Sequence, residues 1–399
     1  MIWPSATIQN ILRLGWKTFN RLHPLPVYVR DAVSDLLACR TAALGGHVQG
    51  CPDRHFIRHW YNSCKNRLCP QCAYILIERW LEKQKARLLG TDHYHVIFTV
   101  PHQLNDIWLL NVRIMTDILF RAVRDTLFDF IEDEKHVGGT PGIISSLHTW
   151  SQTVIFHIHL HCLVTGGALG KDGSWHQPRR SSFLPFKAVM IKYRGKLLDY
   201  LDTAISKREI QLPSGMNRQQ WVNLRNKLGR KVKWNVNFRE RYKNGQGVAI
   251  YLARYLRGGP ISNSRVISCD DKEVTFSYRV NGESKKDVMS LPISQFIRRY
   301  LLHVPLPNKK RVHHYGLYAP GNKDKLDVCR QMFGQLPVGE TDFLTWQEYC
   351  EKQGDQHPEQ CPECGKKLVT LETIPSTRKR VSKFLPQPGQ GIYCGATIC

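Results

Sequence analysis

The sequence lacks three features that would place it in other protein classes. No apolar run approaches the roughly 18 residues that a membrane-spanning helix requires. The N-terminus carries Pro4 and scattered polar residues instead of a continuous apolar segment with a small-residue cleavage site, so we expect no signal peptide and a cytoplasmic protein. A Gly-x-x-x-x-Gly-Lys-Ser/Thr phosphate loop is also absent, which argues against a fused helicase.

Acidic residues are scarce. The 399 residues include 33 Asp and Glu against 57 Lys and Arg, and the formal net charge is +24. Such an excess indicates a polyanionic partner, with nucleic acid as the first choice and a membrane surface as the second. The chain is long enough for two or three domains.

A histidine-rich segment is the first candidate site. Residues 152–164 (QTVIFHIHLHCLV) are mostly β-branched, aromatic or apolar, which predicts a buried strand. Alternate side chains of a strand share a face, so His157, His159 and His161 would project together. Neutral imidazole is the commonest metal-binding side chain, whereas three core histidines would each need a buried hydrogen-bond partner. We therefore predict a metal site on this strand.

Cysteines form the second candidate site. Their number, 13, is odd and several are clustered, which in a reducing compartment favours metal binding over disulfides. Cys69-Pro-Gln-Cys72 has the spacing of a zinc knuckle, in which two thiolates turn around one tetrahedral ion. Cys51, with either Cys64 or His55, is the first choice for the second pair of ligands. The alternative is a set of unpaired buried cysteines.

A further zinc site has several candidate ligands. Cys39 or His47 could complete one near the N-terminus. Cys361-Pro-Glu-Cys364 is a second knuckle near the C-terminus. Its candidate partners form two pairs, Cys350 with His357 or Cys394 with Cys399. The alternative for this region is a degenerate tail, because the Pro- and Gly-rich residues 385–391 divide it.

Two basic stretches predict contacts with DNA. In the first, Arg58, Lys65 and Arg67 are interleaved with aromatic residues, as in grooves that hold DNA backbone and bases. The second, residues 225–243, has eight Lys or Arg residues and one acidic residue, and part of it alternates like an edge strand. Its candidates for DNA binding are Arg230, Lys231, Lys233, Arg239 and Arg241. Either stretch could instead be a solvated surface.

A pair of tyrosines is the third candidate. Residues 247–259 (GVAIYLARYLRGG) are expected to form a helix that ends at the glycines. Tyr251 and Tyr255 are four residues apart and share one helical face, which usually means two core residues. Beside a histidine-bound divalent cation, however, a phenol could attack a phosphodiester and form a covalent phosphotyrosine. Two tyrosines would permit two successive transfers.

The order of these motifs resembles the two-tyrosine rolling-circle transposases of the bacterial insertion-sequence ninety-one family, which belong to the HUH nuclease superfamily. The shared segments are the cysteine knuckle, YHVIFTVPH, HIHLHCLV before Gly-Gly, and YLARY upstream of Pro-Ile-Ser-Asn-Ser-Arg. The resemblance extends from about Cys39 to Tyr318. Family members often have a Cys-x-x-Cys near 51–54; here position 54 is Arg, and His55 could take its place.

The resemblance implies roles for individual residues. His159 and His161 would be the HUH pair that holds Mg²⁺ or Mn²⁺ against the scissile phosphate, and His157 would be a third ligand, with a polar side chain elsewhere as its rival. Tyr251 and Tyr255 would be the nucleophiles that nick and join single-stranded DNA through a 5′-phosphotyrosine. The structural Zn²⁺ module would contribute to the recognition of hairpin-bearing element ends.

The expected fold class is α+β. A strand at 94–100, a helix at 104–131 and the histidine strand predict an antiparallel HUH sheet with helices on one face. An N-terminal zinc-ribbon-like module and a small C-terminal cysteine-knuckle tail would flank it. The predicted segments are a helical arm (1–38), a zinc-binding DNA-recognition module (39–90), the catalytic domain (91–270), its C-terminal part (271–320) and the tail (321–399).

Three other functions fit parts of this pattern. A plasmid-type replication initiator or relaxase would use the same chemistry. A zinc-ribbon DNA-binding protein with a vestigial histidine strand would bind DNA without a covalent adduct. A metallohydrolase with His-x-His ligands would act on small substrates, although the charge of +24 and the paired tyrosines argue against it.

Overall fold

The computed structural model describes residues 6–179, 183–242, 259–280, 285–339, 343, 345–352 and 358–378. The chain divides into two compact units. The histidine unit contains Lys83–Leu256, Pro305–Glu340 and Pro386–Cys399, and the cysteine unit contains Met1–Glu82, Arg257–Val304 and Thr341–Leu385. Within the described ranges, no helix has both the length and the hydropathy that crossing a bilayer would require.

A five-stranded sheet forms the centre of the histidine unit. Its order is β12-β4-β5-β3-β8, and every neighbouring pair is antiparallel. The strands are β3 His93–Thr99, β4 Gly142–Trp150, β5 Phe156–Thr165, β8 Val236–Tyr242 and β12 Val312–Gly316. β5 occupies the middle of this order, and its apolar residues are buried, as a two-sided strand requires. The sheet confirms the predicted α+β class and the central place of the histidine strand.

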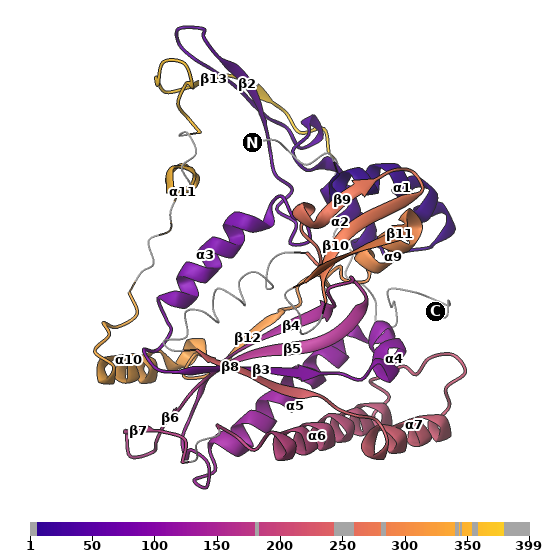
Figure 1. The fold of residues 1–399 in the computed structure, drawn as a ribbon, viewed down its shortest axis with the longest axis vertical. Helices are drawn as coiled ribbons and strands as arrows, with labels where there is room; N and C mark the ends of the chain where they lie inside the picture. Colours follow the sequence, from indigo (N-terminus) through magenta and orange to yellow (C-terminus); the bar gives the residue numbers. More distant parts are fainter. Residues whose placement is uncertain are drawn as a thin grey trace. The chain divides into compact units, whose positions relative to one another are not determined.

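Helices α5 Val112–Ile131 and α6 Phe186–Ser206 cover one face of this sheet (Figure 1). Phe98 of β3 meets Tyr193 of α6 edge to face, with ring centroids 5.0 Å apart. Phe120 of α5 lies 4.1 Å from the ring of His313 on β12. The strand register places Phe98 and His313 on the same face as Cys162 of β5, so the neighbouring odd-numbered histidines of β5 point to the opposite face.

The remaining elements of this unit surround the sheet. Helix α7 begins with a capping box, because Asn217 and Gln220 each accept a hydrogen bond from the other's backbone N–H. The elements are η2 His102–Leu104, α4 Asn105–Leu110, β6 Ala168–Leu169, β7 Trp175–His176, α7 Arg218–Arg230, η4 Pro320–Asn322 and α10 Lys323–Met332. Helix α3, Ala73–Lys85, carries the chain across the unit boundary.

The cysteine unit contains helices and two small antiparallel sheets. One sheet has the order β11-β10-β9, and α9 follows it directly and packs against α1. Gly15 makes that approach possible, because a Cβ atom there would lie 2.6 Å from Cδ1 of Ile297. The elements are α1 Ile8–Leu22, α2 Val27–Ala38, η1 Ala42–Leu44, η3 Asn263–Arg265, β9 Val266–Cys269, β10 Glu273–Arg279, β11 Lys286–Pro292, α9 Ile293–Leu301 and α11 Trp346–Lys352.

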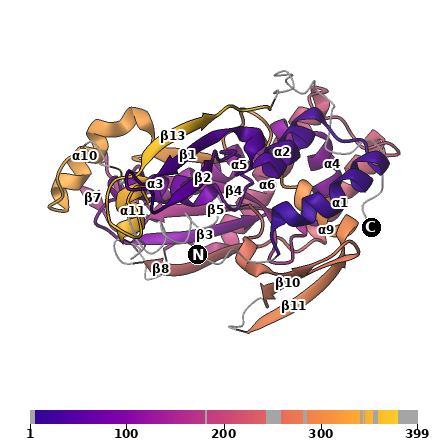
Figure 2. The same cartoon turned by 90° about the horizontal axis from the view of Figure 1, so that it is seen from above.

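The second sheet of the cysteine unit joins the two ends of the chain. Its order is β13-β1-β2, with β1 Gly46–Gly50, β2 Ile57–Tyr61 and β13 Val369–Ile374. Figure 2 shows the yellow C-terminal strand beside the indigo N-terminal strands. Gly46 permits the close approach of β1 to β2, since a Cβ atom there would lie 2.1 Å from the carbonyl oxygen of Trp60. No sequence pattern signalled the pairing of β13 with β1.

Candidate active site and metal centres

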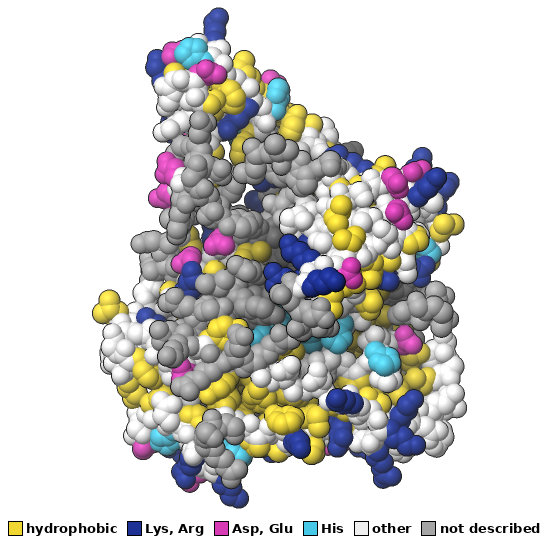
Figure 3. Space-filling model, viewed as in Figure 1, with side chains coloured by type: hydrophobic (Ala, Val, Ile, Leu, Met, Phe, Trp, Pro, Cys, Tyr) yellow, Lys and Arg dark blue, Asp and Glu magenta, His cyan; other side chains and the backbone are white. Residues whose placement is uncertain are grey.

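Three histidines converge on the face of the sheet opposite α5 and α6. His148 of β4 and the two histidines His159 and His161 of β5 each offer a ring nitrogen within 4.8 Å of the others. The register explains this, because His148 lies opposite His159, and Ser146 lies opposite His161. His148 and His161 are buried and His159 is half-buried. In Figure 3, histidine side chains reach the surface at the level of this sheet.

Hydrogen bonds determine which ring nitrogen of His159 and of His161 can face a metal ion. Nδ1 of His159 lies 3.0 Å from the carbonyl oxygen of His157 and donates to it, so Nε2 is the atom left for a metal. Nδ1 of His161 lies 2.8 Å from Nε2 of His95 on β3. Metal-binding histidines commonly donate their second N–H to such an acceptor, which holds the ring in the ligating tautomer. Both rings can therefore present Nε2 to the same point.

Burial favours the neutral form of two of these rings. Burial and then the charge of a protonated His157 lower the pKa of His159 to about 3. The pKa of His148 is also well below its ordinary value, first through burial and then through His159 and Arg311. An imidazole binds a metal in its neutral form, so protons do not compete for the ring nitrogens of His148 and His159 near neutral pH.

His157 does not belong to this group. It lies on the same face of β5 but two residues nearer the N-terminal end of the strand, and the structure brings His148, which the sequence did not single out, together with His159 and His161. His148 is a single histidine in a strand of mixed composition, so its own segment carries no metal signal. Only the register between β4 and β5 identifies it, and that register depends on tertiary pairing.

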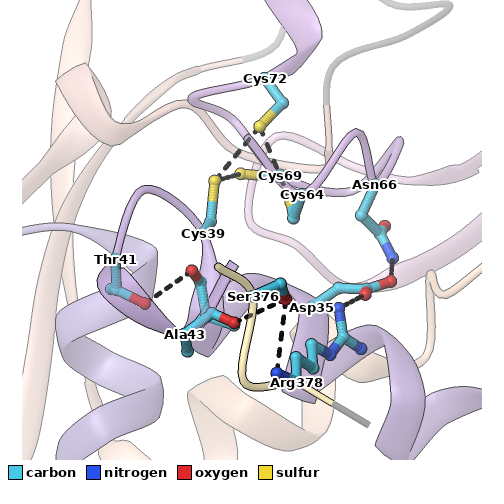
Figure 4. A network of polar contacts seen from close by, with 11 residues as sticks. Asp35, Cys39, Thr41, Ala43, Cys64, Asn66, Cys69, Cys72, Ser376 and Arg378 are labelled. Carbon is cyan, nitrogen blue, oxygen red and sulfur yellow. Dashed lines mark hydrogen bonds and ion pairs between the residues drawn. The ribbon is translucent and has the colours of Figure 1, made fainter. Parts of the chain in front are cut away.

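Four cysteines of the cysteine unit form a second group (Figure 4). Sγ of Cys72 lies 3.2 Å from that of Cys39 and 3.7 Å from that of Cys64, and Cys69 lies 3.6 Å from Cys39. A tetrahedral zinc ion with Zn–S bonds of about 2.3 Å would hold its sulfur atoms about 3.8 Å apart. The group therefore has the dimensions of a four-cysteine zinc site.

The proximity of these thiols also favours a bound cation. Hydrogen bonds from Cys39 and then Cys64 lower the pKa of Cys72, while the same kind of contact with Cys39 raises the pKa of Cys64 and of Cys69. One thiolate thus suppresses the ionisation of its neighbours until a dication compensates for the charge. Zinc meets this need with sulfur ligands.

The partition of the zinc candidates differs from the sequence prediction. The first choices for the knuckle Cys69–Cys72 were Cys51 with Cys64 or His55, whereas the structure supplies Cys39 and Cys64. Cys51 and His55 instead form a third group with Cys361 and Cys364. Among the described residues, Cys350 and His47 join no group of side chains close enough to share a metal ion. His357, Cys394 and Cys399 lie outside the described part of the chain.

The predicted DNA-binding residues lie in four places. Arg58 is engaged internally, because its guanidinium donates to Oε1 of Gln49 and to the carbonyl oxygen of Pro358. Lys65 and Arg67 are exposed on the first knuckle. Exposed residues around the end of α7 are Arg230, Lys231 and Lys233. Arg239 and Arg241 belong to β8, the end strand of the described sheet.

Both predicted nucleophiles, Tyr251 and Tyr255, lie outside the described residues.

The fold and these groups define an α+β protein with a cysteine cluster of zinc-site dimensions and, in its other unit, three imidazoles that could hold a metal. The family model "Transposase zinc-binding domain" matches residues 11–100, and the model "Putative transposase" matches residues 142–325. The first range contains all four cysteines of the second group, and the second range contains all three converging histidines.

Two relatives extend these matches over most of the chain. The "Putative transposase y4qJ" of Sinorhizobium fredii is 33% identical over 380 residues, which are 92% of this chain and 94% of the relative. The "Transposase for insertion sequence element IS801" of Pseudomonas savastanoi pv. phaseolicola is 26% identical over 357 residues, 86% and 83% of the two chains. The chain belongs to the insertion-sequence ninety-one family of transposases, and its N-terminal cysteine cluster is the family's zinc-binding element.

Proposed function

We propose that this transposase nicks and joins single-stranded DNA through a covalent 5′-phosphotyrosine, in a rolling-circle-like transposition. The observation that carries the proposal is the convergence of His148, His159 and His161 on one sheet face in a chain of the transposase family. Three imidazoles on rigid neighbouring strands form a preorganised cation site. The +24 charge supplies the general attraction that a DNA substrate requires.

The donor set favours a particular kind of ion. Imidazole nitrogen is a softer donor than the oxygen ligands that Mg²⁺ prefers, so three histidines favour Mn²⁺ over Mg²⁺ unless substrate oxygens dominate the coordination. The buried hydroxyl of Ser146, opposite His161, has no hydrogen-bond partner among the described residues and is suited to a water or phosphate oxygen. A divalent cation held there supplies Lewis-acid polarisation of the scissile phosphate.

The protein's own nucleophiles perform the proposed transfer. The phenolic oxygen of Tyr251 or Tyr255 bonds to phosphorus, the bond from phosphorus to the 3′ oxygen breaks, and that oxygen leaves as a 3′-hydroxyl. The proton lost by the phenol passes to solvent, and the 3′ oxygen takes one from solvent. The second tyrosine then serves the transfer of the next strand. The phosphotyrosine conserves the energy of the broken phosphodiester, so joining needs no further cofactor.

DNA recognition belongs to the exposed basic residues. Lys65 and Arg67 lie between Cys64 and Cys69 of the zinc cluster, and we propose that this element binds hairpin-bearing ends of the insertion sequence. Arg230, Lys231 and Lys233 would follow the backbone of the single strand.

The test uses labelled single-stranded oligonucleotides that carry candidate element ends, incubated with the full chain and Mn²⁺ or Mg²⁺ and run on a denaturing gel. A metal-dependent, slowly migrating adduct that disappears in Tyr251→Phe/Tyr255→Phe is the expected result. Joining to an unrelated target strand distinguishes a transposase from a replication initiator or relaxase. Retained DNA binding with no adduct on any substrate would reject the nuclease and favour a non-catalytic zinc-ribbon protein.

A further inference from the structure

The third group of candidate metal ligands joins residues that are more than 300 positions apart in the sequence. Cys51 and His55 come from the loop between β1 and β2, and Cys361 and Cys364 come from the segment before β13. One ligand atom from each lies within 4.8 Å of the others. Sγ of Cys51 is 3.5 Å from Sγ of Cys364 and 4.0 Å from Nδ1 of His55. We infer that these four residues bind a second zinc ion, which fastens residues 358–378 to the N-terminal hairpin.

Both loops are folded into turns that suit this role. In the first, Arg54 adopts a φ of 63°, its N–H donates to the carbonyl oxygen of Cys51, and the N–H of Cys51 donates to Phe56. In the second, Gly365 adopts a φ of 72° and donates to the carbonyl oxygen of Cys361. Tight turns of this kind bring ligands that are close in sequence around one tetrahedral ion.

The four residues also lie against packed and paired surroundings. Cys51, Cys361 and Leu368 form a small buried cluster against which Phe56 packs. Nζ of Lys366 lies 2.7 Å from a carboxylate oxygen of Asp53, so the two loops are also paired at their exposed tips.

The attachment of β13 explains why a metal is needed. β13 forms a ladder with β1 from Gly46↔Ile374 to Gly50↔Val369, yet its side chains are exposed except for a half-buried Ile374. Hydrophobic burial therefore contributes little to holding this strand, and an isolated ladder of this length is marginal in water. A bound ion stabilises the folded pairing because the unfolded chain does not bring the four ligands together.

The other end of β13 is already anchored. Arg378 forms an ion pair with Asp35, which also accepts a hydrogen bond from Asn66 of the first knuckle at 2.9 Å (Figure 4). The hydroxyl of Ser376 donates to the carbonyl oxygen of Ala43 at 3.0 Å. The segment thus runs from the proposed second zinc at Cys361 to the surroundings of the first. Cys361 and Cys364 lie outside both ranges matched by the transposase family models, so neither match assigns this site.

The primary test compares zinc content per chain in the full-length protein by elemental analysis. Cys361→Ser/Cys364→Ser is expected to lose one zinc relative to the wild type, and amide exchange in β13 and β1 is expected to accelerate. Cys350→Ser is the matched control, because it removes a buried thiol of the same C-terminal region that joins none of the candidate metal groups found among the described residues. Unchanged zinc content in the double variant, or an equal loss in Cys350→Ser, would overturn the assignment.

A spectroscopic test covers the case in which the double variant fails to fold. Cobalt replaces zinc in such sites, and its visible bands differ between three-sulfur-one-nitrogen and four-sulfur coordination. His55→Cys is expected to keep the metal and shift part of the cobalt spectrum toward that of the four-cysteine site, while His55→Ala should weaken binding. A cobalt spectrum that is identical in wild type and His55→Cys would reject His55 as a ligand. These readouts are independent of DNA cleavage.

Discussion

His95 and His161 share a hydrogen bond across adjacent strands, with Nε2 of His95 lying 2.8 Å from Nδ1 of His161. Both rings are buried, and His95 is not among the three histidines that converge. His95 therefore acts through His161, whose ring it orients so that the opposite nitrogen can reach a cation. Outer partners of this kind tune metal sites almost as strongly as the ligands do.

Removal of that partner should weaken the proposed catalytic metal site. We expect His95→Ala to lower Mn²⁺ affinity by about 10- to 100-fold, the usual cost of losing such a contact, while the zinc content stays unchanged. Isothermal titration with Mn²⁺ measures the affinity. His95→Gln keeps an acceptor and should recover part of the loss. Wild-type affinity in His95→Ala would show that the hydrogen bond does not position the ligand.

Substitutions of His148 and His157 should have unequal effects. Because His148 lies in the converging group and His157 lies outside it, His148→Ala should reduce Mn²⁺ binding and metal-dependent nicking far more than His157→Ala. Both measurements use the same oligonucleotide at several Mn²⁺ concentrations. If His157→Ala proved the more damaging change, the third ligand would be the one that the sequence alone suggested.

Substitutions of Arg58 and of the two basic residues before the knuckle should distinguish a loss of folding stability from a loss of DNA binding. Arg58→Ala loses hydrogen bonds to Gln49 and Pro358, which should cost about 1–3 kcal/mol of unfolding free energy. Lys65→Ala and Arg67→Ala should instead each reduce the slope of log affinity against log salt by about 0.7 on single-stranded DNA. Urea denaturation and salt-dependent binding provide the two readouts. A reduced salt slope in Arg58→Ala at unchanged stability would reverse this assignment.

His93 should make stability depend on pH. Burial lowers its pKa to about 4; its Nδ1 donates to Thr91, and its Nε2 lies 2.6 Å from the hydroxyl of Tyr318. A folded-state pKa below the unfolded value of about 6.5 contributes stability above pH 6.5 that is lost as the pH falls toward 4. Between pH 7 and pH 5 this loss amounts to about 2 kcal/mol. Urea denaturation at the two pH values measures it.

The control for this effect replaces the titrating ring. His93→Asn cannot take up a proton in this range, so its stability should fall less between pH 7 and pH 5 than that of the wild type, even though its stability at pH 7 is lower. Tyr318→Phe removes the hydroxyl that donates to His93 and accepts from the N–H of Leu89, and it should cost about 1–3 kcal/mol at pH 7. Equal pH dependence in wild type and His93→Asn would contradict the account.

The sequence by itself determined the elements whose signals are local. Alternation around His159 and His161 predicts a strand with both imidazoles on one face, because a strand has a period of two. The spacing of Cys69 and Cys72 predicts a knuckle, because two thiolates separated by two residues suffice to turn around zinc. Charge and motif order likewise indicated a DNA-processing protein of the transposase family.

Only the tertiary structure decided which distant residues complete each centre. His148 joins the histidines through the register of β4 on β5, and Cys39 reaches the first knuckle because α2 ends beside it. Cys51 meets Cys364 because β13 pairs with β1. Strand register and long-range pairing arise from the packing of the whole chain. Contacts between residues that are distant in the sequence therefore cannot be predicted from a local sequence pattern.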